Sequence, residues 1–235
     1  MTEASPRAIV TGSSSGIGRA IAQKLLIDGW AVQGLDLQAP GFEHARFTAR
    51  QIDLCTLRRN DADLERLTAE GPPAALVHAA GWMSTAPLGQ LDADAGERMW
   101  QIHVQALTVL ADVLIPAMAD AGHGRVVLIG SRVAAGMAGR SQYAACKAAL
   151  TGLARSWAAE VIGRGVTVNV VSPAATATPM LADPSRASAA PKVPPIGRFI
   201  EPAEVAALTA FLLSSQAGAI TGQDIAVCGG ATLRG

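Results

Sequence analysis

Short apolar runs alternate with longer amphipathic stretches along most of this chain, and this alternation restricts the possible folds more than any other feature. The strand-like runs are 7–11, 31–36, 47–53, 74–78, 124–129, 166–171 and 224–227. The helix-like stretches between them include 18–28, 93–118, 142–161 and 202–213. Several strands are apolar throughout, as expected for strands buried on both faces of a parallel sheet. The sequence therefore predicts an α/β fold, a doubly wound parallel sheet with helices on both faces.

The length and composition favour one packed unit. We expect a single domain over residues 1–235, because 50% of the 235 residues are hydrophobic and 16% are charged. The formal net charge is zero and no block of like charges occurs. Neither nucleic acid nor an anionic membrane is therefore expected as a partner.

The N-terminal segment and the cysteines indicate a reducing compartment. The segment 1–7 has no signal-peptide pattern, and no apolar run reaches the roughly 18 residues of a membrane span. Cys55, Cys146 and Cys228 are widely spaced and lack metal-ligand spacing, which predicts reduced thiols and no metal site. We therefore expect a cytoplasmic protein.

A glycine-rich turn with the sequence GSSSGIG joins the first strand to the first helix. Its three glycines suit a tight turn, close approach of the backbone to a pyrophosphate, and close packing of the helix on the sheet. The helix N-terminus offers free N–H groups and a partial positive charge to the phosphates. The turn predicts a Rossmann-like dinucleotide site. Its expected cofactor contacts are Gly12, Ser14, Ser15, Gly16, Ile17 and Gly18.

An acidic residue, Asp36, ends the second predicted strand. A carboxylate about 20 residues after such a turn accepts hydrogen bonds from the adenosine ribose, and it repels a 2′-phosphate. No Arg or Lys lies within the turn or directly after Asp36, so we predict NAD in preference to NADP. A turn cap is the alternative role for Asp36. Asp53, at the end of the third predicted strand, is expected either to contact the adenine edge or to cap a turn at the surface.

Tyr143 and Lys147 are four residues apart, which places them on one face of a helix. A free tyrosine has a pKa of about 10 and is a poor acid–base catalyst at neutral pH. A lysine ammonium one helical turn away stabilises the phenolate. Ser131 ends the buried strand upstream and could hold a substrate oxygen beside Tyr143. The three residues together predict proton transfer to or from a bound alcohol or ketone.

With these residues in place, the sequence resembles the single-domain branch of the short-chain dehydrogenase/reductase family, over nearly the whole chain. The turn matches the family's cofactor turn, and Ser131, Tyr143 and Lys147 match its catalytic serine, tyrosine and lysine. The runs 169–173 and 178–180 resemble the segment that lines the nicotinamide, with Thr178 at the position that contacts the carboxamide. The runs 220–223 and 229–230 resemble the family's C-terminal strand region. The further cofactor contacts that this implies are Ala80, Gly81, Tyr143, Lys147, Pro173, Thr176 and Thr178.

The resemblance implies a mechanism and an assembly. Ser131 orients the substrate oxygen, Tyr143 exchanges its proton, and Lys147 supports Tyr143 and binds the nicotinamide ribose, while the cofactor carries hydride. We expect an NAD-dependent enzyme acting on a small secondary alcohol, such as a sugar, polyol or hydroxy acid. Reduction of a carbonyl or a 3-oxoacyl thioester is one alternative, and a non-catalytic nucleotide-binding protein is another. A homo-oligomer, commonly a tetramer, is also implied, with 93–118 and 142–161 as its interface.

Two histidines depart from the family pattern. His78 stands where the family usually has an asparagine that ties strands together, which predicts an altered structural hydrogen bond. His103 stands where the family usually carries the asparagine of a catalytic tetrad. One hypothesis is that His103 replaces that asparagine in proton transfer and makes activity depend on pH near neutrality. The alternative is a packed helix histidine.

The substrate pocket is expected to involve Met83, 133–136, 139–142 and a loop at 181–195 over the site. Arg132 and Arg140 flank these segments. Either could bind a substrate carboxylate, or face solvent or a neighbouring subunit. These alternatives remain open from the sequence.

Overall fold

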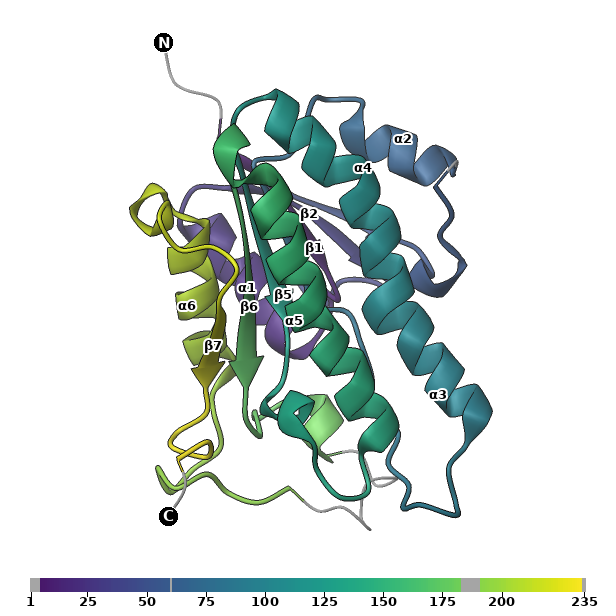
Figure 1. Cartoon of the computed structure of the whole chain (residues 1–235). Helices are drawn as coiled ribbons and strands as arrows, with labels where there is room; N and C mark the ends of the chain where they lie inside the picture. Colours follow the sequence, from purple (N-terminus) through teal and green to yellow (C-terminus); the bar gives the residue numbers. More distant parts are fainter. Residues whose placement is uncertain (1–4, 60, 183–190, 234–235) are drawn as a thin grey trace.

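In a computed structural model, described for residues 5–59, 61–182 and 191–233, seven parallel strands form one sheet (Figure 1). Their order is β3-β2-β1-β4-β5-β6-β7. The predicted doubly wound α/β fold is confirmed. The strands are β1 Arg7–Thr11, β2 Ala31–Asp36, β3 Phe47–Gln51, β4 Ala75–His78, β5 Gly124–Ile129, β6 Val166–Pro173 and β7 Asp224–Val227.

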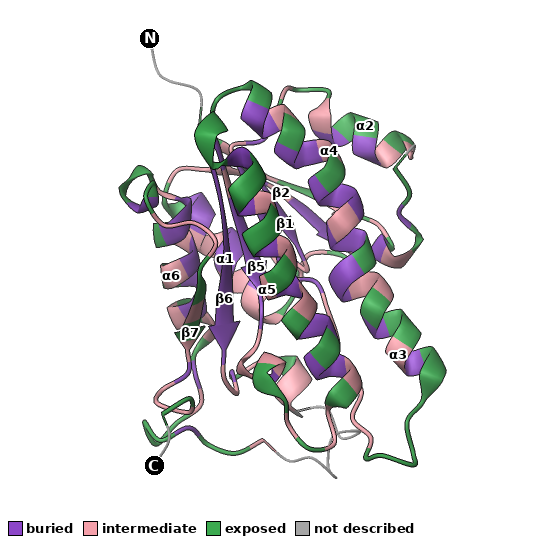
Figure 2. Cartoon of the chain, viewed as in Figure 1, coloured by how far each residue is buried: buried purple, intermediate pink, exposed green. Residues whose placement is uncertain are grey.

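Helices cover both faces of the sheet (Figure 1). On one face, α1 (Gly16–Ile27) and α6 (Pro202–Leu213) pack together over the strands, through side chains such as Leu25 and Val205. On the other, α2 (Ala62–Thr68), α4 (Ala106–Asp120) and α5 (Ser141–Val161) cover it through side chains such as Leu110 and Leu150. The central strands are buried along their length, as Figure 2 shows for β5 and β6. Burial of both faces explains why these strands are continuously apolar.

The carboxyl ends of the strands meet at one edge of the sheet, because all the strands are parallel. β1 and β4 are neighbours there, and Thr11 pairs with His78 at their ends. The chain leaves β1 for the α1 face, whereas the segments between β4 and β6 cover the opposite face. Ligands of open α/β sheets bind at such a switch point, outside the carboxyl ends of the strands.

The long helix predicted over 93–118 is interrupted. It consists of α3 (Ala93–Trp100), a π-helical turn η2 (Gln101–Gln105) and α4. Single π turns within helices are often found at functional sites, and this one carries His103. The whole run, Ala93–Asp120, is long and apolar enough by length and composition to cross a membrane, whereas no apolar run of that length was expected from the sequence. Here 61% of its most apolar window is buried inside the protein, largely against the sheet.

Several predicted boundaries differ from the structure. The third strand ends at Gln51 instead of Asp53, because Asp53 caps the short helix η1 (Leu54–Thr56). The sixth strand continues to Pro173, and the first helix begins at Gly16, within the glycine-rich turn. The helix α2 was not predicted. Further short 3₁₀ helices are η3 Arg132–Ala135, η4 Ile162–Arg164, η5 Pro179–Ala182 and η7 Ser215–Ala217.

Candidate active site

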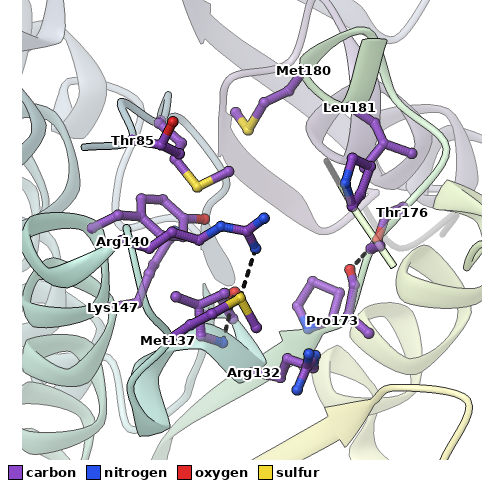
Figure 3. A pocket seen from close by; sticks show the side chains of 18 of the residues that line it. Thr85, Arg132, Met137, Arg140, Lys147, Pro173, Thr176, Met180 and Leu181 are labelled. Carbon is purple, nitrogen blue, oxygen red and sulfur yellow. Dashed lines mark hydrogen bonds between the residues drawn. The ribbon is translucent and has the colours of Figure 1, made fainter. Parts of the chain in front are cut away.

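A cavity of about 880 Å³ opens at the carboxyl edge of the sheet (Figure 3). All four predicted catalytic residues line it, although they come from η2, the end of β5 and α5. The four are Ser131, Tyr143, Lys147 and His103. Predicted cofactor contacts also line it, namely Ile17, Gly81, Pro173, Thr176 and Thr178. The structure therefore brings the predicted catalytic set and part of the predicted cofactor set to one site.

The helix α5 holds Tyr143 and Lys147 one turn apart on its buried side, with 8% and 5% of each residue exposed. The Lys147 Nζ lies 5.7 Å from the centre of the Tyr143 ring. Ser131 caps η3 in extended conformation, and its Oγ accepts a hydrogen bond of 3.2 Å from the Val133 amide. A hydroxyl, a phenol and an amine thus line the same cavity.

Lys147 is held at the end of β5. Its Nζ donates a 2.7 Å hydrogen bond to the Ile129 carbonyl. Burial disfavours the charged form and lowers the pKa of Lys147 to about 7. Protonation of this amine is therefore balanced near neutrality, which suits a group that exchanges protons with its surroundings.

His103 is almost fully buried, with 1% exposed, and its ring makes an edge contact with Tyr143 at 5.4 Å between centroids. Its Nε2 lies 2.8 Å from the Trp82 carbonyl, which can only accept, so Nε2 carries the proton. Its Nδ1 then presents a lone pair, and within the described residues this atom is buried without a hydrogen-bond partner. His103 lines the cavity and keeps this acceptor unused within the described residues.

The expected titration of His103 near neutrality is not supported. Burial, followed by the charge of Lys147, holds the pKa of His103 well below its usual 6.5. The imidazole is neutral throughout the neutral range. Any pH dependence of activity near pH 7 must then come from another group, and Lys147 is the candidate on this cavity.

His78 forms the altered structural hydrogen bond that the sequence predicted. Burial lowers its pKa to about 3, so the ring is neutral. Its Nε2 donates to the Ile102 carbonyl at 3.1 Å, and its Nδ1 accepts from Thr11 Oγ1 at 3.0 Å. Thr11 Oγ1 in turn accepts from the amides of Ala79 and Ala80. This network ties β1, β4 and the π turn together beneath the cavity.

The glycine-rich turn has the close contacts that a dinucleotide cradle requires. A Cβ on Gly12 would lie 2.8 Å from Ala80 Cα, and a Cβ on Gly18 would overlap the Gly12 carbonyl. Gly16 opens α1 with φ of +52°, and its Cβ position lies 3.3 Å from Thr178 Cγ2. Ser15 caps the helix without a side-chain hydrogen bond to its first turn. The Ser15 side chain therefore does not occupy the first-turn amides, the groups that a helix N-terminus offers to phosphates.

Asp36 is tied to this turn. One carboxylate oxygen accepts from the Ser14 amide and the other from the Gln38 amide, each at 2.9 Å. Asp53 is exposed, and its carboxylate accepts from the Cys55 amide at 2.9 Å. This contact is the surface cap that the sequence analysis gave as one of two roles for Asp53. The adenosine contacts of both residues stay predictions.

Arg19 is a residue that the sequence reasoning missed. It directly follows Gly18, its guanidinium carbon lies 5.8 Å from the centre of the Phe42 ring, and a Cβ on Gly41 would lie 3.4 Å from its Nη1. The turn, Arg19 and the segment after β2 are thus neighbours. The sequence could have pointed to Arg19 through its position directly after the glycine-rich turn.

Not every predicted residue lines the cavity. The outer part of the cofactor set lies beyond it: Gly12, Ser14, Ser15, Gly16, Gly18, Asp36, Asp53 and Ala80. Of the predicted substrate segments, Met83, Val133, Gly139 and Arg140 line the cavity, whereas 134–136 and 141–142 do not. Gln142 is turned away, donating to the Asp92 carbonyl at 2.9 Å.

The predicted loop contributes Leu181, Pro191 and Lys192 to the cavity wall, and its stretch 183–190 lies outside the described residues. Additional lining residues that the sequence did not single out are Thr85, Ala86, Pro87, Gln90, Met137 and Ala138. Over the described parts of the chain, no group of three His, Cys, Asp or Glu side chains is arranged to hold a metal ion.

Comparison with known proteins identifies the family to which this chain belongs. A family model described as enoyl-(acyl carrier protein) reductase matches residues 12–232. The chain is 36% identical over 234 residues to a 3-oxoacyl-[acyl-carrier-protein] reductase of Salmonella typhimurium, covering 95% of this chain and 96% of the relative. It belongs to the short-chain dehydrogenase/reductase family. As a member, it is an oxidoreductase that uses a nicotinamide cofactor.

Members of this family with different substrates are also similar to the chain. A D-threitol dehydrogenase of Mycolicibacterium smegmatis is 32% identical over 244 residues, covering 97% of this chain and 93% of the relative. A solved structure from Beutenbergia cavernae, assigned as an NAD(P)-dependent gluconate 5-dehydrogenase with NADP bound at low occupancy, superposes with a TM-score of 0.87. It is 30% identical, covering 99% of this chain and 98% of that one. Family membership therefore leaves the substrate open.

Proposed function

We propose that this chain is an NAD-dependent dehydrogenase that interconverts a secondary alcohol and a ketone on a small polar molecule, such as a sugar, polyol or hydroxy acid. The observation that carries the proposal is the convergence of Ser131, Tyr143 and Lys147 on one cavity, opposite the predicted nicotinamide contacts Thr176 and Thr178. The similarity to a D-threitol dehydrogenase and to a protein assigned as a gluconate 5-dehydrogenase supports this substrate class.

In this proposal the side chains of the protein transfer the proton, and the cofactor transfers the hydride. Bound nicotinamide supplies the hydride acceptor or donor. Ser131 Oγ orients the substrate oxygen, and the Tyr143 hydroxyl takes its proton during oxidation or donates one during reduction. The Lys147 ammonium stabilises the Tyr143 phenolate, which accepts the substrate proton during oxidation and is left behind after donation during reduction, since opposite charges at short distance favour each other's charged forms.

His103 is proposed to support this transfer as a neutral acceptor. His103 lines the cavity that holds Tyr143 and Lys147, its Nδ1 has no hydrogen-bond partner among the described residues, and its Nε2–H is held by the Trp82 carbonyl. A water molecule that donates to Nδ1 would be placed to exchange protons with this pair. In this form of the proposal the imidazole keeps its own proton, because it does not ionise near neutrality.

NAD is proposed over NADP because Asp36 ends β2 beside the turn. The Asp36 carboxylate is held by the Ser14 and Gln38 amides, and we expect it to accept from ribose hydroxyls and to repel a 2′-phosphate. One observation favours NADP as a second candidate: the Arg19 guanidinium lies near the same part of the turn. The NADP in the solved relative agrees with that alternative.

A second substrate class is a 3-oxoacyl thioester. The curated relative from Salmonella typhimurium supports it, because its name states that activity. The same residues would then donate a proton from Tyr143 to the carbonyl oxygen. A nucleotide-binding protein without turnover is the third candidate, and the proposed Ser131, Tyr143 and Lys147 set favours the enzyme over it.

The experiment follows reduced nicotinamide while purified protein and NAD or NADP are offered sugars, polyols, hydroxy acids and secondary alcohols. A parallel panel offers ketones and 3-oxoacyl thioesters with the reduced cofactors. Tyr143→Phe should lower turnover at least about 10²-fold while cofactor affinity stays within about two-fold, because only the proton-transferring oxygen is removed. Cofactor binding without turnover on any panel would contradict the enzymatic proposal and favour the non-catalytic one.

The compartment and the assembly are part of the proposal. A cytoplasmic homo-oligomer, with α4 and α5 at its interface, follows from the family resemblance. A groove of about 420 Å³ between these helices, lined by Thr108, Ile115 and Trp157 among others, supports that face as the interface. Sedimentation of the purified protein measures the oligomeric state. A monomer at micromolar concentration would remove the interface from the proposal.

A further inference from the structure

The glycine pair Gly229 and Gly230 forms a tight turn directly after β7. Both residues have positive φ, +53° and +84°. The Ala231 amide closes the turn by donating to the Cys228 carbonyl at 3.0 Å. Because residues with a Cβ rarely adopt φ of this sign, the turn depends on glycine. We call residues 228–233 the C-terminal turn.

Two walls of the cavity are tied to this end of the chain. Arg132, which directly follows Ser131, donates from Nη1 to the Ala231 carbonyl at 3.3 Å. The Ala174 amide donates to the Val227 carbonyl, at the end of β7, at 3.1 Å. Both Arg132 and Ala174 line the cavity. The C-terminal turn and the strand before it therefore border the wall that carries the proposed catalytic serine and the wall proposed for the nicotinamide.

A third wall is formed by the described end of the predicted substrate loop, where Pro191 and Lys192 line the cavity. A few residues further on, the Ile196 amide donates to the Gly229 carbonyl at 3.0 Å. A Cβ on Gly229 would lie only 2.5 Å from Ile196 Cγ2 and 3.2 Å from Pro194 Cβ. The C-terminal turn and this segment are thus in direct contact, and they lie side by side at one end of the molecule (Figure 1).

The segment 191–200 is held differently at its two ends. Ile200 is 2% exposed and forms a parallel bridge with Thr176, so packing and the backbone both fix it. Ile196 is 51% exposed, and packing contributes less there because apolar burial stabilises in proportion to the area removed from water. The cavity end of the segment therefore depends on the backbone contact between Ile196 and Gly229.

We infer that the C-terminal turn sets the position of the cavity wall formed by Pro191 and Lys192, with Gly229 as the positioning residue. The inference rests on the proposed dehydrogenase function and adds to it a determinant of substrate affinity. Gly229 does not line the cavity and acts through the backbone of Ile196. By holding this segment and Arg132 together, the turn fixes the width of the space that receives the substrate.

The test compares two glycines of similar backbone conformation. Gly229→Ala should displace the segment, because its Cβ would meet atoms next to the backbone of Ile196 and Pro194. Gly222→Ala is the matched control, since Gly222 has φ of +68° but its Cβ position lies 3.7 Å from Ala158 Cβ, an ordinary contact. Both variants carry the cost of a Cβ at positive φ, and only Gly229→Ala moves the cavity wall.

Two further variants separate the contact from the backbone cost. Ile196→Ala removes the Cγ2 atom that the new Cβ would overlap, so combining it with Gly229→Ala should restore part of the lost function. Arg132→Gln releases the C-terminal turn from η3 without a backbone change. These variants keep the inference testable even where Gly229→Ala alone does not fold.

Two measurements are made on the whole protein. Hydrogen–deuterium exchange of the amides in 191–200 needs no substrate. Steady-state kinetics with D-threitol, gluconate and 3-hydroxybutyrate, each with NAD and NADP, give KM and kcat, and NADH fluorescence gives cofactor affinity. The kinetic split matters because a displaced binding wall raises KM, whereas a general loss of folded enzyme lowers kcat.

In Gly229→Ala we expect the amides of 191–200 to exchange at least about 5-fold faster, because the hydrogen bond that protects them is displaced. KM for the probes that are turned over should rise about 5- to 50-fold, with kcat and NADH affinity within about three-fold. Gly222→Ala should change none of these by more than about two-fold. Arg132→Gln should speed exchange in 191–200 in the same direction.

The outcomes separate this inference from the proposed function. Faster exchange with unchanged KM, or equal effects of Gly229→Ala and Gly222→Ala, would overturn the inference and keep the enzyme. A local change in exchange without turnover of any probe by the parent protein would support the positioning role and contradict the enzymatic proposal. A raised KM in Arg132→Gln with unchanged exchange in 191–200 would assign Arg132 to substrate binding and overturn the inference.

Discussion

At the scale of single residues, the closest packing around the candidate site is between Gly81 and His103. A Cβ on Gly81 would overlap Cε1 of the His103 ring and lie 2.6 Å from its Nδ1. The ring cannot easily move away, because it is buried and its Nε2 is bound to the Trp82 carbonyl. The absence of a side chain at Gly81 is what lets a histidine occupy a position where the family usually has the smaller asparagine.

This packing predicts a coupling that double mutants can measure. Gly81→Ala should lower the free energy of unfolding by about 1–3 kcal/mol, the usual cost of overpacking. In a His103→Asn background the same change should cost at least about 1 kcal/mol less, because the smaller side chain leaves room. Urea denaturation of the four proteins gives the coupling energy.

The control for this cycle is Gly152→Ala. Gly152 is exposed within α5, and its Cβ position has no heavy atom within 4 Å. The free energy of unfolding should therefore rise by about 0.5–1 kcal/mol, because alanine loses less conformational freedom in a helix than glycine. Additive costs for Gly81→Ala and His103→Asn would show that the two positions are not packed against each other in solution.

At the scale of elements, the end of β2 and the start of α1 act together on the cofactor. Asp36→Ser removes a negative charge that repels a 2′-phosphate and an acceptor for the ribose hydroxyls. The ratio of kcat/KM with NADP to that with NAD should therefore rise about 10- to 100-fold. Steady-state kinetics with each cofactor measure this ratio.

Two further variants give the cofactor prediction its control. Asp53→Ser removes an exposed carboxylate that caps η1, so the cofactor ratio should change less than about two-fold. Arg19→Gln added to Asp36→Ser should reverse most of the gain, because the Arg19 guanidinium lies near the same part of the turn. A parent enzyme that prefers NADP would show that Arg19 outweighs Asp36.

The elements were largely predictable because their patterns are local. Continuous apolar strands such as 124–129, and the glycine-rich turn at the first strand–helix junction, specify a parallel sheet and its switch point without tertiary information. The Tyr143 and Lys147 spacing similarly places both side chains on one helix face. Each of these features is formed by residues that are close together in the sequence, so the sequence displays it directly.

The missed elements depend on contacts between distant segments. The π turn at 101–105 interrupts a helix whose apolar pattern is continuous on both sides, so no local signal reports it. The neutral state of His103 depends on its burial and on Lys147, 44 residues further along the chain. The end of β3 at Gln51 is an exception with a local cause, because Asp53 caps η1 through the Cys55 amide. No sequence motif marks Thr85 as a cavity residue, because its segment is positioned by the hydrogen bond from the Ala86 amide to the distant Gly139 carbonyl.

At the scale of the whole molecule, two buried neutral histidines make folding sensitive to acid. Burial lowers the pKa of His78 to about 3 and holds the pKa of His103 well below 6.5. In the unfolded chain both rings titrate at their usual pKa of about 6.5. Below that pH the unfolded state binds more protons than the folded state, so the free energy of unfolding falls as the pH falls.

Each histidine should contribute about 1.4 kcal/mol of lost stability per pH unit below about pH 6, so the pair should contribute about 2.7 kcal/mol per unit as long as both rings stay neutral in the folded protein. His78→Asn and His103→Asn should each flatten the plot of unfolding free energy against pH by about half of this contribution, whatever they do to stability at pH 7. His123 is exposed, so His123→Asn is the control that leaves the slope unchanged. Urea denaturation from pH 7.5 to pH 4.5 measures the slopes. Equal slopes in the parent and the two buried-site variants would mean that both rings take up protons in the folded protein as readily as in the unfolded chain. The neutral acceptor role proposed for His103 would then fail.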